Sequence, residues 1–78
     1  MTIWKEKNNR LVADLEFRDF NEAWACMNRI AELCKSHDHH PTWTNTYNQL
    51  HIELSTHDAG DRVTQKDTDL ARAIEEIF

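Results

Sequence analysis

The sequence of 78 residues contains only one glycine, one proline and two cysteines. So little glycine and proline, beside three tryptophans and one tyrosine, argues against an intrinsically disordered chain. No apolar run approaches the roughly 20 residues that cross a bilayer, and the residues that follow Met1 do not resemble a signal peptide. The sequence therefore predicts one small domain over residues 1–78 that has no contact with a membrane.

Basic residues are also in the minority. Nine lysines and arginines against fourteen aspartates and glutamates give a net charge of −5. Without a basic surface, the chain lacks the electrostatic attraction that holds proteins to a phosphate backbone. We therefore expect no direct contact with nucleic acid.

The two cysteines, Cys26 and Cys34, fall within one predicted helix. At a rise of about 1.5 Å per residue they would lie roughly 12 Å apart along its axis, which is too far for a disulfide. Two reduced thiols are typical of the cytosol, and we expect the protein to be cytoplasmic.

Hydropathy alternates with a period of two in the first part of the chain. From Leu11 to Phe17, apolar and polar side chains alternate, which is typical of a half-buried strand. The preceding pair Asn8-Asn9 suits a tight turn, because asparagine tolerates a left-handed backbone. Residues 3–17 are therefore predicted to form a β-hairpin.

A helical period follows this hairpin. Asp19 and Glu22 form a capping pair, and apolar residues then recur at helical spacing from about Phe20 to about Lys35. This pattern predicts one amphipathic helix that buries a single stripe.

The second half of the chain shows the same kinds of signal. Residues 36–45 are polar and predict a loop, which can include a short strand over residues 42–46. Alternation returns from Tyr47, a turn falls at residues 58–61, and the pair Thr64 and Asp67 begins a second helix. The predicted fold class is α+β: a two-layer sandwich with the helices on one face of an antiparallel sheet of about four strands.

Three interpretations compete for the histidines. Metal binding requires a fixed set of ligands, but the adjacent His39 and His40 diverge in an extended chain and no helical i, i+4 pair exists, so we expect no metal. Histidines in polar segments are also often solvated, and His37 and His51 are assigned no role. The third interpretation is acid–base catalysis, since an imidazole with an ordinary pKa of about 6.5 exchanges protons at neutral pH. Spacing alone does not decide among them.

A longer pattern does distinguish these interpretations. The stretch Asp38-His39-His40-Pro41-x-Trp43 and the stretch Leu54-Ser55-Thr56-His57 resemble the signature of the pterin-4a-carbinolamine dehydratases, and the similarity extends from about Trp4 to Ile77. The matching pattern is Lys35-x3-His39-His40-Pro41-x5-Tyr47-x9-His57-x9-Asp67.

The resemblance implies a hydro-lyase. Its reaction would be the dehydration of a 4a-hydroxytetrahydropterin, such as 4a-hydroxytetrahydrobiopterin, to the quinonoid dihydropterin by histidine acid–base catalysis without a cofactor. This reaction serves aromatic amino-acid hydroxylases. The implied catalytic residues are His39, His40 and His57, and the implied substrate-binding residues are Trp43, Asp38, Thr56 and Asp67.

Two features depart from the family's pattern. Family members usually carry a helix before the first strand, which a chain that opens at Met1 and continues to Trp4 is expected to lack. Lys35 stands where glutamate is common, and a cation near the histidines would disfavour their protonated forms.

A thin core and an uncovered apolar face predict a homodimer or homotetramer.

Other functions stay open at this point. Members of the superfamily also occur where aromatic hydroxylases are absent, so a related role in pterin or molybdopterin metabolism is an alternative. Some animal members act as dimerisation cofactors of a homeodomain transcription factor. In this chain, such a binding role would use the exposed side of the first helix, including Arg29 and Glu32.

Overall fold

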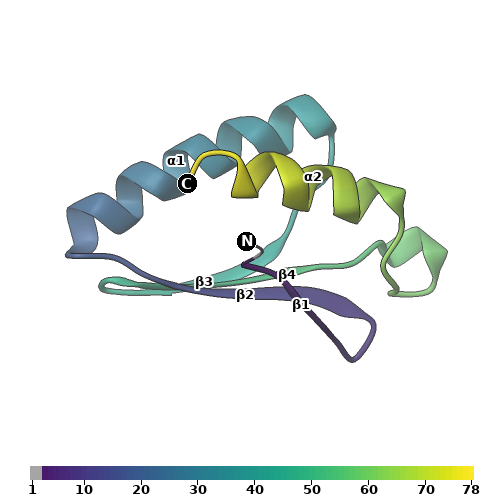
Figure 1. The fold of residues 1–78 in the computed structure, drawn as a ribbon. Coiled ribbons are helices and arrows are strands. Elements are labelled where there is room, and N and C mark those ends of the chain that lie inside the picture. Colours follow the sequence, from purple (N-terminus) through teal and green to yellow (C-terminus); the bar gives the residue numbers. More distant parts are fainter. Residues whose placement is uncertain (1–2) are drawn as a thin grey trace.

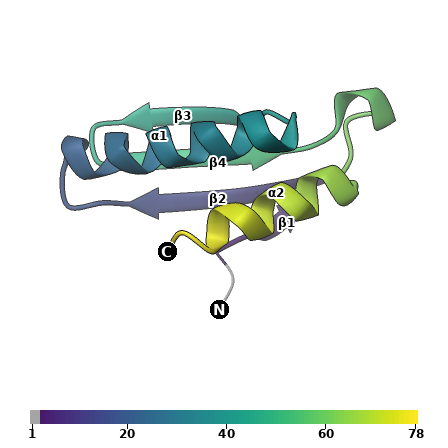
Figure 2. The same cartoon turned by 90° about the horizontal axis from the view of Figure 1, so that it is seen from above.

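The chain folds into a four-stranded antiparallel sheet with two helices on one of its faces (Figure 1). The computed structural model describes residues 3–78. The elements are β1 (Lys5–Lys7), β2 (Arg10–Glu16), α1 (Phe20–His37), β3 (Thr42–Thr46), β4 (Gln49–Leu54), the 3₁₀ turn η1 (His57–Ala59) and α2 (Gln65–Glu75). The strands lie in the order β1-β2-β4-β3. Seen from above, α1 lies over the β3 side of the sheet and α2 over the β1 side (Figure 2). The predicted α+β sandwich is confirmed.

β1 and β2 form the hairpin that the sequence predicted, with strands that are shorter than the predicted span. Asn8 and Asn9 turn the chain with φ angles of 52° and 62°. Two left-handed residues in succession match the twist of the flanking strands. Lys7 then pairs with Arg10, and β2 pairs on its other side with β4.

Both ends of α1 are capped. The Asp19 carboxylate accepts a hydrogen bond from Glu22 N at 2.9 Å, which satisfies one free donor of the first turn. At the other end, Asp38 takes a left-handed φ of 49° and its N–H bonds back to the last turn of the helix. α1 thus runs to His37, slightly past the predicted end, and its cap turns the chain toward His39.

β3 and β4 form a second hairpin. The strand β3 occupies the segment in which the sequence allowed one. Tyr47 has a φ of 51°, so Tyr47 and Asn48 form the turn, and β4 begins at Gln49 rather than at Tyr47 as predicted. The Asn45 side chain holds this turn by donating to Tyr47 O at 3.2 Å and to Gln49 O at 2.9 Å.

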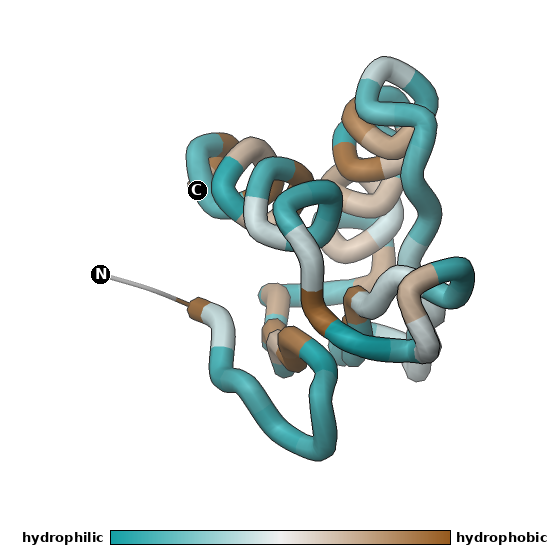
Figure 3. The backbone as a smooth tube through the Cα atoms, turned by 90° about the vertical axis from the view of Figure 1, so that its right-hand side faces the viewer, coloured by the Kyte–Doolittle hydropathy of each residue, from teal (hydrophilic) through white to brown (hydrophobic). Residues whose placement is uncertain are grey.

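The apolar core lies between the helices and the sheet. Along both helices, hydrophobic and hydrophilic residues alternate in Figure 3, as expected for helices that are buried on one side. Cys26 and Cys34 are free and buried, and burial raises the pKa of both thiols. Within residues 3–78, neither helix is long and apolar enough to cross a membrane. The core cluster is Cys26, Ile30, Cys34, Leu50, Ile52, Leu54, Leu70, Ala71 and Ile74.

Candidate active site

One carboxylate is completely buried where α2 begins. It belongs to Asp67, whose exposed fraction is 0%. Asp67 is the third residue of α2, and its Oδ2 accepts a hydrogen bond from Thr64 N at 2.8 Å. This contact satisfies a backbone donor at the start of the helix, as the capping pair in the sequence predicted.

Two further side chains bind the same carboxylate. Thr56 Oγ1 donates to Asp67 Oδ2 at 2.7 Å, and His39 Nε2 lies 2.5 Å from Asp67 Oδ1. Burial alone would raise the pKa of this carboxyl group, but the hydrogen bonds from His39, Thr56 and the Thr64 backbone hold the pKa of Asp67 below its usual value. Asp67 is therefore ionised at neutral pH. Because an ionised carboxylate only accepts hydrogen bonds, His39 carries a hydrogen on Nε2 in this contact.

His39 also lines a pocket of about 340 Å³ near the end of β4. This pocket brings together the three histidines that the resemblance implied, along with Asp38 and Thr56 from the implied substrate-binding set. The His39 side chain is 11% exposed and that of His57 is 90% exposed, so the pocket has a deep side and an open side. Its lining residues are Asp38, His39, His40, Ser55, Thr56, His57, Asp58 and Lys66.

Local backbone signals bring these residues together. His39 and His40 follow the left-handed cap of α1 and precede Pro41, which disfavours helix in the residue before it. β4 ends at Leu54, and His57 is the first residue of η1. His57 therefore comes from a turn, whereas the sequence predicted a strand end, because the chain leaves the sheet before reaching it.

The structure separates Trp43 and Asp67 from the pocket surface. Trp43 is half-buried in β3, opposite Ile52 in the sheet register, and packs against the core rather than lining the pocket. The alternation of β3 directs this ring toward the core, so Trp43 is not among the residues that line this pocket. Asp67 is buried and reaches the pocket only through His39 and Thr56.

Three lining residues were not singled out from the sequence. Ser55 stands inside the motif stretch over residues 54–57 but was given no role, and Asp58 and Lys66 are the immediate neighbours in sequence of His57 and Asp67. That adjacency is the signal that could have found them. Lys35, the departure from the family pattern, does not line the pocket and instead pairs with Glu32 at 3.2 Å on the exposed side of α1.

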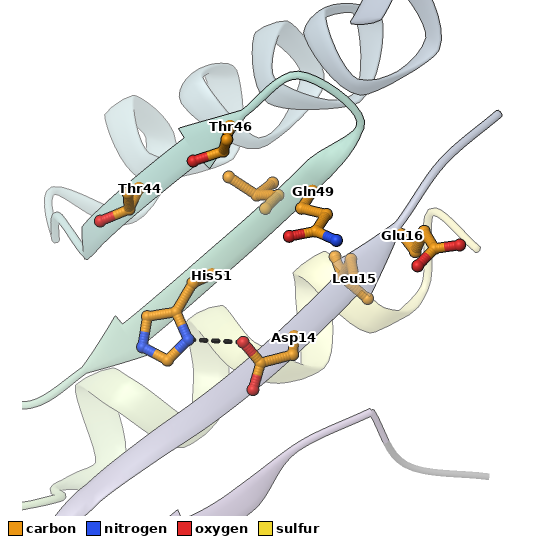
Figure 4. A pocket seen from close by; sticks show the side chains of 8 residues that line it. Asp14, Leu15, Glu16, Thr44, Thr46, Gln49 and His51 are labelled. Atoms are coloured by element: carbon orange, nitrogen blue, oxygen red, sulfur yellow. Dashed lines mark hydrogen bonds and ion pairs between the residues drawn. The ribbon is translucent and has the colours of Figure 1, made fainter. Parts of the chain in front are cut away.

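His51 lies on the open face of the sheet, away from the helices. Its Nδ1 is 2.6 Å from Asp14 Oδ1, and its Nε2 is 2.8 Å from Glu53 Oε2; Figure 4 shows the contact with Asp14. The hydrogen bond to Asp14, and to a lesser extent the one to Glu53, raises the pKa of His51. The sequence assigned this histidine no role, and only the register, which pairs it with Asp14, reveals the contact. Two shallow hollows of about 350 and 700 Å³ adjoin it, but among their lining residues His51 is the only histidine.

The contribution of His51 to stability should fall as the pH rises. Because its pKa is raised in the folded protein, the protonated ring stabilises the fold fully below the unfolded pKa of about 6.5. That contribution is lost as the pH rises through the higher folded value. Urea unfolding from about pH 5 to pH 8 should show this small loss, and an Asp14→Asn variant should reduce it. An identical pH dependence in the two proteins would contradict the assignment.

Two of the pocket histidines have a carboxylate beside one ring nitrogen. Within residues 3–78, no three histidine, cysteine, aspartate or glutamate side chains are placed to hold a metal ion together. His39 uses Nε2 on Asp67, and His57 Nδ1 lies 3.1 Å from Asp61 Oδ1. Each of these rings therefore has one nitrogen engaged by a carboxylate.

Comparison with known proteins decides the family. The model of the family described as pterin 4 alpha carbinolamine dehydratase matches residues 1–77. This chain belongs to the pterin-4-alpha-carbinolamine dehydratase family. A relative from Synechococcus sp. (strain WH7803) is 43% identical over 74 residues, which cover 95% of this chain and 78% of the relative. Another, from Christiangramia forsetii, is 47% identical over 74 residues, which cover 95% of this chain and 75% of the relative. Both are named as pterin-4-alpha-carbinolamine dehydratases.

A solved structure shares the dehydratase fold. The crystal structure of a transcriptional coactivator/pterin dehydratase from Brucella melitensis matches with a TM-score of 0.89 and 31% sequence identity, and the match covers 96% of this chain and 81% of that chain. The family and its enzyme class, the hydro-lyases, are therefore confirmed as the sequence predicted.

Proposed function

We propose that this chain dehydrates a 4a-hydroxytetrahydropterin to the quinonoid dihydropterin. The observation that supports this most strongly is that His39, His40 and His57 line one pocket, with His39 held by the buried Asp67. Membership of the dehydratase family supports the choice of a pterin carbinolamine as the substrate class.

The reaction needs an acid and a base at neighbouring atoms of the pterin ring. The C4a–O bond breaks as the hydroxyl group takes up a proton and leaves as water. The N5 lone pair forms the new C4a=N5 double bond, and the resulting cation becomes neutral when N5 releases its proton. Positioned imidazoles can supply both functions near neutral pH, and such acid–base catalysis typically contributes about 10²–10⁴-fold in rate.

We assign proton transfer to His39 and His57, and positioning of the ring to His40. His39 and His57 each have a carboxylate partner that engages one ring nitrogen, while among residues 3–78 His40 has no such partner. Asp38 and Thr56 line the pocket and can contact the polar edge of the substrate.

Two implied substrate-binding residues receive other roles in the proposal. Asp67 acts through His39 because it is fully buried, and Trp43 makes no direct contact because it does not line the pocket.

The proposed reaction is tested by direct assay. The carbinolamine, generated enzymatically or chemically, is mixed with the purified chain, and its dehydration is followed by absorbance in a stopped-flow instrument. We expect a faster decay than the spontaneous reaction, in proportion to protein concentration. A decay rate equal to the spontaneous one at all protein concentrations would contradict the proposed function.

We also propose that the protein is a homodimer or homotetramer. Phe20 and Trp24 stack on the surface of α1 with ring centroids 6.1 Å apart, and they are 42% and 52% exposed. Exposed aromatic residues that lie together typically mark an interface. Light scattering in dilute solution should give at least the mass of a dimer, and Trp24→Glu should lower it. A monomeric mass at micromolar concentration would refute the proposal.

A binding role is the second candidate function, because the Brucella melitensis protein is also described as a transcriptional coactivator. In this chain, Arg29 and Glu32 are exposed on α1, away from the histidine pocket. A binding role would therefore survive His57→Ala but weaken on Arg29→Glu, whereas dehydration should respond in the opposite way.

A further inference from the structure

The turn between β4 and α2 holds an aspartate against one of the pocket histidines. Asp61 N donates to Thr56 O at 3.1 Å, and Thr56 N donates to Arg62 O at 2.9 Å. These bonds close the turn and return residue 61 to the side of residue 57. Gly60, with a φ of 83°, and Asp61, with a φ of 57°, supply the left-handed backbone that the turn requires.

The contact in this turn selects one nitrogen of the His57 ring. Asp61 Oδ1 lies 3.1 Å from His57 Nδ1. An ionised carboxylate can only accept a hydrogen bond, so the contact places a hydrogen on Nδ1. In the neutral ring, Nε2 then has the free lone pair, which is the form that a general base requires.

His39 is held by the opposite ring nitrogen. Asp67 engages His39 Nε2, whereas Asp61 engages His57 Nδ1. Two carboxylates from different elements thus fix two different orientations of imidazole around one pocket. The His39 pair is buried, and the His57 pair is open to solvent, with side chains that are 90% and 58% exposed.

We propose that Asp61 is a positioning residue that holds His57 in the Nδ1–H form and presents Nε2 as the base that removes the N5 proton. This inference rests on the proposed dehydration reaction and deepens it by assigning the base. Asp61 falls inside the unspecified x9 segment between His57 and Asp67, so the family signature does not mark it.

The effect on turnover should be modest and specific. An exposed carboxylate–imidazole pair is weakened by water, so removing Asp61 should lower kcat about two- to fivefold and leave KM nearly unchanged. Asp61→Gly removes the carboxylate, and glycine readily adopts the left-handed backbone at this position. Asp61→Asn keeps the shape of the side chain but removes its charge, and asparagine also tolerates this backbone. Asp61→Gly should therefore lose more than Asp61→Asn.

A double-variant comparison separates positioning from a general structural effect. With His57→Gln already present, Asp61→Gly should cause no further loss of kcat, because the ring that it positions is absent. The matched control is Asp14→Asn, which removes a carboxylate from His51 on the open face of the sheet and should leave kcat unchanged. An equal loss from Asp61→Gly with and without His57 would overturn the proposal.

Nuclear magnetic resonance of the full chain, with nitrogen-15 in its histidines, reads the tautomer without any substrate. In the wild type we expect neutral His57 to carry its hydrogen on Nδ1, and Asp61→Gly should shift the population toward Nε2–H. A wild-type His57 that is mainly Nε2–H would overturn the role of Asp61 even in an active enzyme. An inactive wild-type chain would instead refute the proposed function, whatever the tautomer.

Discussion

His39→Ala and His57→Ala are each expected to lower kcat for the carbinolamine by about 10²–10⁴-fold, which is the usual contribution of one general acid or base. Both rings line the pocket, and each has one nitrogen engaged by a carboxylate, so the proposed proton transfer uses the other nitrogen. Proton transfer stabilises the transition state and contributes little to substrate binding, so removing it should lower kcat and leave KM nearly unchanged. Steady-state kinetics of the purified variants measure both constants.

His40→Ala should behave differently from these two variants. His40 lines the same pocket and is assigned to positioning, so its loss should mainly raise KM. His37→Ala and His51→Ala are matched controls, since neither residue lines the pocket, and both should retain wild-type turnover. Wild-type turnover in all three pocket variants would end the proposed mechanism.

Asp67→Ala is expected to destabilise the fold by about 3–5 kcal/mol, the usual cost of breaking a buried hydrogen-bonded charge network by removing one partner. The Asp67 carboxylate is fully buried and accepts hydrogen bonds from His39, Thr56 and the Thr64 N–H. Each donor that loses its acceptor in a buried site costs free energy. Urea unfolding with wild-type and variant protein measures the change in the free energy of unfolding.

Two comparisons sharpen the Asp67 experiment. Asp69 lies two residues further along the same helix, and its carboxylate accepts a hydrogen bond from the exposed Gln65 side chain. Asp69→Ala should therefore change stability by less than about 0.5 kcal/mol. In a cycle with His39→Ala, the two single losses should sum to more than the double loss, because the residues interact directly. Equal losses at Asp67 and Asp69 would contradict a special role for the buried carboxylate.

The same carboxylate predicts a loss of stability in acid. The pKa of Asp67 is lowered in the folded protein, so its contribution is fully present above the unfolded carboxyl pKa of about 3.9. It is lost as the pH falls through the lower folded value. Asp67→Ala should therefore remove part of the acid sensitivity of unfolding.

Much of this protein could be predicted from the sequence because its local patterns agree with its fold. Alternation over the segment that became β2 predicted a strand, and the capping pair at Asp19 and Glu22 predicted the start of α1. The Asn8-Asn9 pair predicted a hairpin turn. The resemblance carried by the motif from Lys35 to Asp67 identified the family. It also implied five of the residues that line the pocket, namely Asp38, His39, His40, Thr56 and His57. These features depend on neighbours within a few positions or on a pattern of residue types along the chain.

Only the tertiary structure decided which side chains meet and how. His39 and Asp67 are 28 positions apart, and His51 and Asp14 are 37 apart, so their contacts depend on how α2 and the strands pack. The period of hydropathy along a strand or helix indicates only which face of that element a residue occupies. It could therefore place Trp43 in a strand but could not show where its ring lies relative to the pocket. The closed turn that brings Asp61 to His57 depends on a backbone bridge between Thr56 and Arg62, which no spacing of residue types specifies. Distances between side chains follow from the packing of whole elements, and that packing exists only in the folded molecule.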